Sequence, residues 1–267
     1  MQFAALAAGC SVVSALAAIA LSGAARRVGL VSRSRRDRFG PGRVPLSGGP
    51  GLLLGALAAL VALGIPLGPG RAVAAAGFFA LGLWDDLREL RPLPKALLQT
   101  CVAALAAWLF APSPIYIGPA VLVLLFLVNA SNYLDNMDGL LPGVALAQAT
   151  ALALAGTSAG PGAALLLWAA PGILLLNLPP ARLYLGDSGS HLVGALLACD
   201  ALDLLFDEAG FRARHALPLL LLFAVPIADV AAVTISRARR RRPIFRGGTD
   251  HLSHRLVRLG FPAPRAV

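Results

Sequence analysis

Five aspartates stand at the ends of apolar segments in a chain that otherwise carries little charge. Of 267 residues, 58% are hydrophobic and 13% are charged, and the mean hydropathy is +0.76. Carboxylates near lipid are costly unless a cation balances them, which makes each one a functional candidate. Oxygen ligands without neighbouring Cys or His suit Mg²⁺ or Mn²⁺ better than zinc. We therefore predict a divalent-cation and phosphate site made by Asp85, Asp86, Asp135, Asp138 and Asp187.

The stretch NASNYLDNMDGL, residues 129–140, gathers acids and amides directly after a very apolar run. Asn132, Asp135 and Asp138 recur every three residues, so neighbours in the series share one helix face. A helix cap would need a single residue of this kind. We therefore favour a binding role here, with Asn129 and Asn132 contacting substrate and Asp135 and Asp138 contributing to catalysis or metal binding.

The other two acidic motifs, taken singly, fit a structural role as well as a functional one. Adjacent Asp85 and Asp86 repel each other unless a cation lies nearby, but an ordinary helix end beside basic residues would look the same. In YLGDSGS, a helix N-terminus at Gly186 and Ser188 could bind phosphate through its free N–H groups, with Asp187 holding a metal. A simple Asp-Ser helix cap is the competing interpretation.

The C-terminal stretch DHLSHRL places His251 and His254 three residues apart, next to Arg255. Without a Cys or a third His, zinc is not expected. We predict a surface that contacts pyrophosphate; the alternative is a basic tail lying on anionic lipid. Asp229 lies inside the last apolar segment, toward its cytoplasmic half, and is expected to support the site of the five aspartates from below, because intramembrane carboxylates are usually functional.

Long apolar windows predict an all-α, polytopic membrane helix bundle that forms one domain over residues 1–267, with a basic tail at 237–267. The first window has no basic residues before it, so we expect a spanning helix there and not a signal peptide. About nine spans are expected. They cover residues 3–22, 48–67, 71–84, 96–111, 119–131, 140–157, 161–178, 188–206 and 215–236.

Nine spans put 20 of the 23 Lys and Arg residues on one side of the membrane. By the positive-inside rule that side is cytoplasmic, with the N-terminus outside and the C-terminus in the cytoplasm. The five aspartates emerge on the same side. The net charge of +10 is explained by these loops, so we do not expect nucleic-acid binding. The three cysteines are far apart and read as small buried apolar residues.

These blocks, in this order, resemble the polyprenyl-phosphate N-acetylhexosamine-1-phosphate transferase family, within glycosyltransferase family 4. LWDDL, followed by Lys95, is similar to the family's Asp-Asp motif, and NASNYLDNMDGL to its Asn-x-x-Asn-x-x-Asp-x-x-Asp-Gly block. YLGDSGS resembles its Gly-Asp-x-Gly-Ser block. RVPLSGG, which begins at Arg43, resembles a Pro-x-x-Gly-Gly motif, and DHLSHRL the terminal His motif. The chain departs from that last motif by having Ser253 where a further His is usual.

The resemblance implies transfer of a sugar-1-phosphate, such as HexNAc-1-phosphate from UDP-GlcNAc, to undecaprenyl or another polyprenyl phosphate. UMP is released, in the first membrane step of cell-envelope glycan synthesis, and Mg²⁺ or Mn²⁺ is the expected cofactor. Asp187 is then the best candidate metal ligand. Lys95, His251, His254, Arg43 and Arg255 would hold phosphates. We also expect a homodimer in the inner (plasma) membrane, with the active site on the cytoplasmic face.

Three other classes stay open at this stage. A proton- or cation-coupled transporter could use the same acids, although such sites favour the bilayer midplane and internal repeats. A membrane anchor with a basic lipid-binding tail would leave the acids unexplained. A metal-dependent lipid phosphatase would hydrolyse where the resemblance implies transfer.

Overall fold

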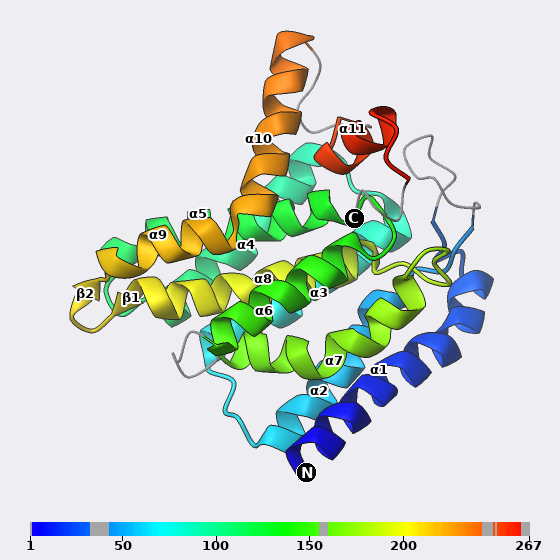
Figure 1. The fold of residues 1–267 in the computed structure, drawn as a ribbon. Coiled ribbons are helices and arrows are strands. Elements are labelled where there is room, and N and C mark those ends of the chain that lie inside the picture. The colour runs from blue at the N-terminus through cyan, green and yellow to red at the C-terminus, as the bar shows by residue number, and fades with distance from the viewer. Residues whose placement is uncertain (1, 33–42, 155–159, 242–247, 249, 263–267) are drawn as a thin grey trace.

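The computed structural model describes residues 2–32, 43–154, 160–241, 248 and 250–262. Within them the chain is almost entirely helical (Figure 1). One 3-10 turn, η1 (Pro114–Tyr116), precedes α5, and a two-stranded hairpin joins β1 (Phe206–Asp207) to β2 (Gly210–Phe211). The α-helices are α1 (Gln2–Arg27), α2 (Gly48–Leu63), α3 (Pro69–Arg88), α4 (Pro92–Phe110), α5 (Ile117–Leu134), α6 (Leu140–Leu154), α7 (Pro161–Asn177), α8 (Gly186–Leu205), α9 (Ala213–Leu222), α10 (Ala224–Arg239) and α11 (Leu252–Arg258).

The predicted all-α class is confirmed, and the chain is a membrane protein. Each of the nine predicted spans coincides with a helix, except that the last is divided between α9 and α10. Among the described residues, α1, α4, α5 and α8 are long and apolar enough to cross a bilayer, and the α9–α10 pair would make a fifth crossing. Helices α2, α6 and α7 are apolar but shorter. The count of nine crossings and the orientation stay predictions.

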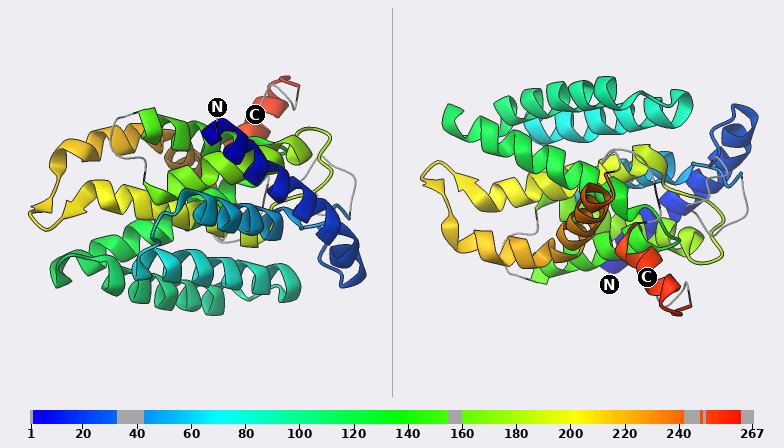
Figure 2. Two further views of the ribbon diagram at one scale, coloured as in Figure 1. Left: turned by 90° about the horizontal axis from the view of Figure 1, so that it is seen from below. Right: turned by 90° about the horizontal axis from the view of Figure 1, so that it is seen from above.

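Helix α8 is the centre of the bundle. It packs against α2, α3, α5 and α7, and most of its residues are buried even though the helix is apolar enough to face lipid. Helices α3 and α4 lie side by side along one flank (Figure 2). Small residues line the contacts of α8 with its neighbours. At Gly82 of α3, for example, an added Cβ would lie 2.4 Å from the carbonyl oxygen of Asp187 in α8. Such small residues let helix backbones approach closely in a membrane.

The last predicted span bends by 69° between α9 and α10. Pro226 has no N–H to donate to the carbonyl four residues earlier, that of Leu222. The Gln148 amide of α6 donates to that oxygen instead, at 3.2 Å. A freed carbonyl in an apolar region needs such a partner. The bend sends α10 away from the bundle axis, where it meets α5 and α11 (Figure 1).

A second charged cluster lies at the opposite end of α8 from the predicted site. The guanidinium of Arg71, on α3, bonds Asp200 at 3.1 Å and also bonds Asp203. Asp200 in turn accepts hydrogen bonds from the N–H groups of Gly162 and Ala163, at the start of α7. This cluster therefore ties α3, α7 and α8 together at one end of the bundle.

Replacing Arg71 by methionine is expected to destabilise the fold by about 3–5 kcal/mol, because it leaves the carboxylate of Asp200 buried without its cation. The Asp200 side chain is only 2% exposed. Denaturant unfolding in detergent would measure the change. Arg212→Met is the matched control, since it breaks a partly exposed pair with Asp207 on the hairpin and should change stability little. Equal losses in the two variants would contradict a structural role for the Arg71 cluster.

Candidate active site

Lys95 joins two carboxylates that come from different helices. Its ammonium lies 2.7 Å from Asp85, at the end of α3, and 2.5 Å from Asp187, in the first turn of α8. Lys95 itself stands in the first turn of α4, which Pro92 begins. Its side chain is 18% exposed, so the cluster is largely shielded but still open to solvent. Three helices thus bring together residues up to 102 positions apart. Of the five aspartates expected to share one site, Asp85, Asp86 and Asp187 meet here.

Helix α5 adds an amide to this cluster. The Asn132 side chain donates to Asp187 at 2.8 Å and to the hydroxyl of Ser190 at 3.0 Å. Asp187 therefore receives a lysine on one oxygen and an amide on the other. Its position is fixed before any ligand binds, which suits a group that must act on a substrate of defined geometry.

Asp86 plays a different part from its neighbour Asp85. Its two oxygens accept the backbone N–H groups of Asp187 and Ser188 at 2.8 and 3.0 Å, so it caps the N-terminus of α8. Gly186 has φ +70°, and an added Cβ would lie 2.7 Å from the Asp86 carboxylate. These N–H groups, predicted to bind phosphate, are already occupied. Ser188 is fully buried. The structure thus favours structural roles for Asp86, Gly186 and Ser188.

Both acids at the end of α3 lie beyond its apolar part and have raised pKa values. Burial is the main cause for each. For Asp85 the hydrogen bond with Asp187 adds to the increase, whereas Lys95 opposes it. For Asp86 the charge of Asp187 adds to burial and raises the pKa to about 7. The charge of Asp187 therefore still disfavours ionisation of Asp86, even though Lys95 lies between Asp85 and Asp187.

A second polar layer lies one helical turn deeper. Asn129 donates to Gln99 at 3.1 Å and to the Leu125 carbonyl at 2.8 Å, and the Gln99 amide lies 3.4 Å from the His191 ring. Gln99 and His191 are buried. Asn129 thus supports the helix packing below the acids instead of lying among them. Gln99 follows Lys95 by four residues and His191 follows Asp187 by four, and that spacing was the signal that could have revealed this layer.

The loop after α5 carries the other two predicted acids, Asp135 and Asp138. Asp138 accepts the N–H of Ala181 at 3.0 Å, and the next N–H, that of Gly139, donates to Asn177. Asp135 ends α5 and is 6% exposed. Asp138 therefore braces the loop that leads into α8. A direct catalytic or metal role for Asp135 and Asp138 stays a prediction.

The histidines stand on α11 and its N-terminal boundary, against the loop after α5. The rings of His251 and His254 lie 5.8 Å apart, and Tyr133 packs edge-on against His251 at 5.7 Å. Ser253 donates to the Asn136 side chain at 2.7 Å, which gives the departure from the His motif a structural use. Arg255 holds backbone carbonyls of Asp250 and Ala232.

The segment that begins at Arg43 reaches α8 through its backbone. Tyr184 donates to Pro45, and the N–H groups of Gly48 and Gly49 donate to Tyr184 and Leu185. The Pro-x-x-Gly-Gly motif thus holds the chain that enters α8. Arg43 is exposed, with φ +71°, and a phosphate contact by its side chain stays a prediction.

The donor chemistry fits a hard cation with few protein ligands. Among the described residues no three Asp, Glu, His or Cys side chains are grouped to hold one ion. Joint metal binding by Asp135, Asp138 and Asp187 therefore stays a prediction. Asp85 and Asp187 do converge on one cationic group, that of Lys95. Mg²⁺ commonly binds through one or two carboxylates together with waters and substrate phosphates. Asp187 and Asp85 are therefore the two carboxylates best placed to hold a Mg²⁺ ion.

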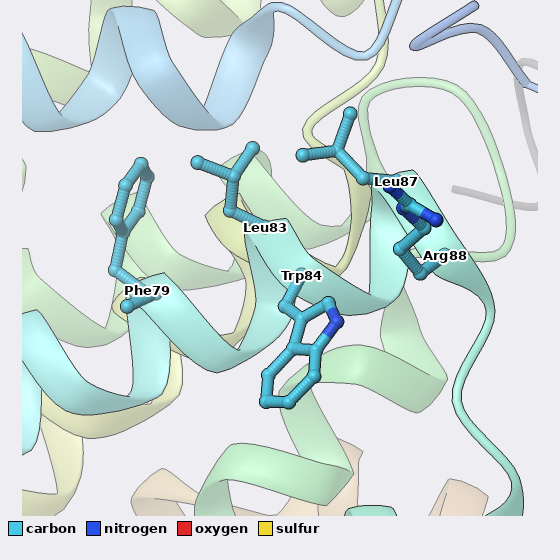
Figure 3. Close-up of a pocket in the computed structure, with 6 residues that line it drawn as sticks. Phe79, Leu83, Trp84, Leu87 and Arg88 are labelled. Carbon is cyan, nitrogen blue, oxygen red and sulfur yellow. The ribbon is translucent and has the colours of Figure 1, made fainter.

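A shallow apolar groove runs along the surface of α3, next to this cluster. Its volume is about 800 Å³. In Figure 3 the side chains of Leu83 and Leu87 extend away from that of Trp84, and Arg88 lies near the end of the helix. The groove contains none of the predicted site residues. It is lined by Phe79, Ala80, Leu83, Trp84, Leu87 and Arg88.

The fold and site define a helical membrane protein with an acid–lysine–amide cluster at one end of its central helix. The model of glycosyl transferase family 4 matches residues 69–205. The chain belongs to this family. The match includes the Lys95 cluster in full and the loop after α5, but not His251 and His254.

Three relatives extend the comparison. A protein of Streptomyces coelicolor named as a glycosyltransferase is 37% identical, over 96% of this chain and 63% of its own length. Decaprenyl-phosphate N-acetylglucosaminephosphotransferase of Mycobacterium tuberculosis is 32% identical, over 74% of this chain and 59% of its own. Undecaprenyl-phosphate alpha-N-acetylglucosaminyl 1-phosphate transferase of Yersinia pestis is 27% identical, over 90% and 73%. The chain thus spans about three fifths of the length of the first two.

Proposed function

We propose that this protein transfers N-acetylhexosamine-1-phosphate from a UDP-sugar to a polyprenyl phosphate and releases UMP. The observation that carries the proposal is the Lys95 ammonium held between Asp85 and Asp187. Two of the relatives described above are named for transfer of N-acetylglucosamine phosphate to decaprenyl or undecaprenyl phosphate. The comparisons lend no support to the transporter alternative.

The location of the cluster agrees with such a reaction. A polyprenyl phosphate presents its phosphate only at the membrane surface, and a nucleotide sugar reaches that surface only from water. The cluster lies at helix ends, where these two meet. We place it on the cytoplasmic face of the inner membrane, since 20 of 23 basic residues belong to that side under the nine-span topology.

In the reaction, an acceptor phosphate oxygen attacks the β-phosphorus of the donor. A new phosphorus–oxygen bond forms, and the bond from the β-phosphorus to the bridging oxygen breaks, so that UMP leaves with that oxygen. Asp85 orients the acceptor phosphate or accepts its proton. Lys95 holds phosphate oxygens. We assign contacts with the pyrophosphate to His251 and His254, and to the part of the Arg255 guanidinium that does not bond backbone carbonyls. Mg²⁺, when bound with Asp187, would neutralise charge that develops on the leaving phosphate.

Detergent-purified protein tests the proposal directly. It is incubated with Mg²⁺, undecaprenyl phosphate and separate radiolabelled donors, UDP-GlcNAc and UDP-GalNAc among them. We expect lipid-extractable label with one donor, UMP in equal amount, and loss of both when EDTA removes the metal. Hydrolysis of lipid phosphate without label transfer would favour a phosphatase. Absence of label with every HexNAc donor, in protein that remains folded, would contradict the proposal.

A further inference from the structure

Asp229 is a buried carboxylate outside the Lys95 cluster. It lies on α10, six residues after the break from α9 at Phe223, and only 2% of it is exposed. A carboxylate in an apolar helix must find partners to offset the cost of leaving water. Both of its oxygens do so on the same short stretch of chain. One lies 2.7 Å from the His251 ring nitrogen Nδ1, and the other accepts the N–H of Leu252 at 2.7 Å.

This arrangement fixes the imidazole of His251. A carboxylate that faces Nδ1 selects the ring form that carries hydrogen there, which leaves Nε2 as the other functional nitrogen. The edge contact with Tyr133 restrains the ring from a second direction. The side chain of His251 is only 8% exposed, so it has little freedom to turn.

The hydrogen bond from Leu252 adds a constraint on the backbone, because it holds the start of α11 against α10. Other contacts clamp α11 independently. Arg237 of α10 bonds Asp250 at 3.3 Å, and Ser253 bonds Asn136 at 2.7 Å. If α11 needed only to be held in place, these clamps would share that task. Asp229 alone among these clamping residues also contacts the His251 ring.

We propose that Asp229 is a positioning residue for phosphoryl transfer and acts through His251, whose imidazole it orients. The inference rests on the proposed function, because it assumes that His251 contacts the phosphates of a substrate. Carboxylates that orient metal-bound histidines commonly contribute about tenfold to a hundredfold to activity, and we expect an effect of similar size here.

A double-mutant cycle in the label-transfer assay tests the inference. Asp229→Asn is expected to lower kcat by about tenfold to a hundredfold while changing KM for either substrate less than about twofold. In a His251→Ala background the same substitution should change turnover less than about twofold, because the group it orients is gone. Independent, multiplying losses would overturn the inference.

Arg237→Met is the matched control, because it loosens α11 from α10 without touching His251. It should lower thermal stability and leave the kcat of the folded fraction within about twofold of wild type, whereas Asp229→Asn lowers kcat at full folding. If both variants lose kcat only in proportion to folded protein, Asp229 is a structural clamp and the inference fails.

Two further results separate this inference from the proposed function. Label transfer by wild type with normal turnover in His251→Ala would overturn the inference and leave the proposed function standing. Absence of transfer by folded wild type would sink the proposed function itself. If Asp229→Asn does not fold, nitrogen-15 NMR of histidine-labelled wild type tests the contact with Asp229 directly. We expect the His251 ring to carry hydrogen on Nδ1. A neutral ring protonated only at Nε2 would overturn the inference.

Discussion

Replacing Asp187 by asparagine is expected to lower label transfer by at least about a hundredfold, with little change in protein yield or folding. Asparagine has nearly the same shape and can still meet the Asn132 side chain, which lies 2.8 Å away. It carries no negative charge, however, so it can neither balance Lys95 nor serve as a strong ligand for a hard cation. The measurement is initial rate at saturating donor and acceptor, over a range of Mg²⁺ concentrations.

Asp207→Asn is the matched control for this experiment. Asp207 lies in the hairpin that follows the far end of α8, where its carboxylate pairs with Arg212. The same change of charge there should leave the rate unaltered. If Asp187→Asn keeps a tenth or more of wild-type turnover, Asp187 does not belong to the metal site, and the role given to it above is wrong.

The convergence of Asp85, Asn132 and Asp187 could be predicted from the sequence because helix direction alternates. Each residue ends or begins an apolar segment, and segments of known order place those ends on one side. The roles of adjacent Asp85 and Asp86 could not be predicted in the same way. Neighbouring residues on a helix point about 100° apart, so one meets Lys95 and the other meets the start of α8. Which one does so depends on how α3 is rotated against α8, a matter of packing at Gly82.

The depth of a residue along its helix was a second feature that the sequence did not predict. Asn129 and Asn132 share a face, but one turn of helix separates them, by about 4.5 Å along the axis. That distance takes Asn129 out of the acid cluster and into contact with Gln99. A sequence pattern assigns a face readily. It does not say at which residue the solvent-accessible site stops and the packed interior begins.

The break in the last predicted span, in contrast, has a visible cause in the sequence. Pro226 lies inside the apolar run, and a proline there leaves one carbonyl without its donor. What the sequence did not show was the partner that tolerates the break, Gln148 on α6. The bend matters for function because it directs α10 toward α11. Asp229 was expected to support the site, and its contact with His251 gives that expectation a physical form.

Replacing Lys95 by methionine is expected to lower turnover by about a hundredfold or more, a loss that excess Mg²⁺ does not restore. The ammonium lies between Asp85 and Asp187, so its removal leaves two carboxylates facing each other without a positive charge. It also removes a donor for phosphate oxygens. The carboxylates of Asp85 and Asp187 are 14% and 28% exposed, so water can solvate them, and the effect on folding should be smaller than that of Arg71→Met.

Lys95→Arg separates the charge from its geometry. Arginine keeps the positive charge, but its planar guanidinium cannot occupy the position of a compact ammonium in a closely packed cluster. Partial activity is therefore expected, between that of wild type and that of Lys95→Met. Recovery of Lys95→Met by high Mg²⁺ would mean that the lysine only fills the place of a cation between the acids. In that case the phosphate contact assigned to Lys95 would be wrong, and the phosphates would depend on the histidines and arginines of the C-terminal segment.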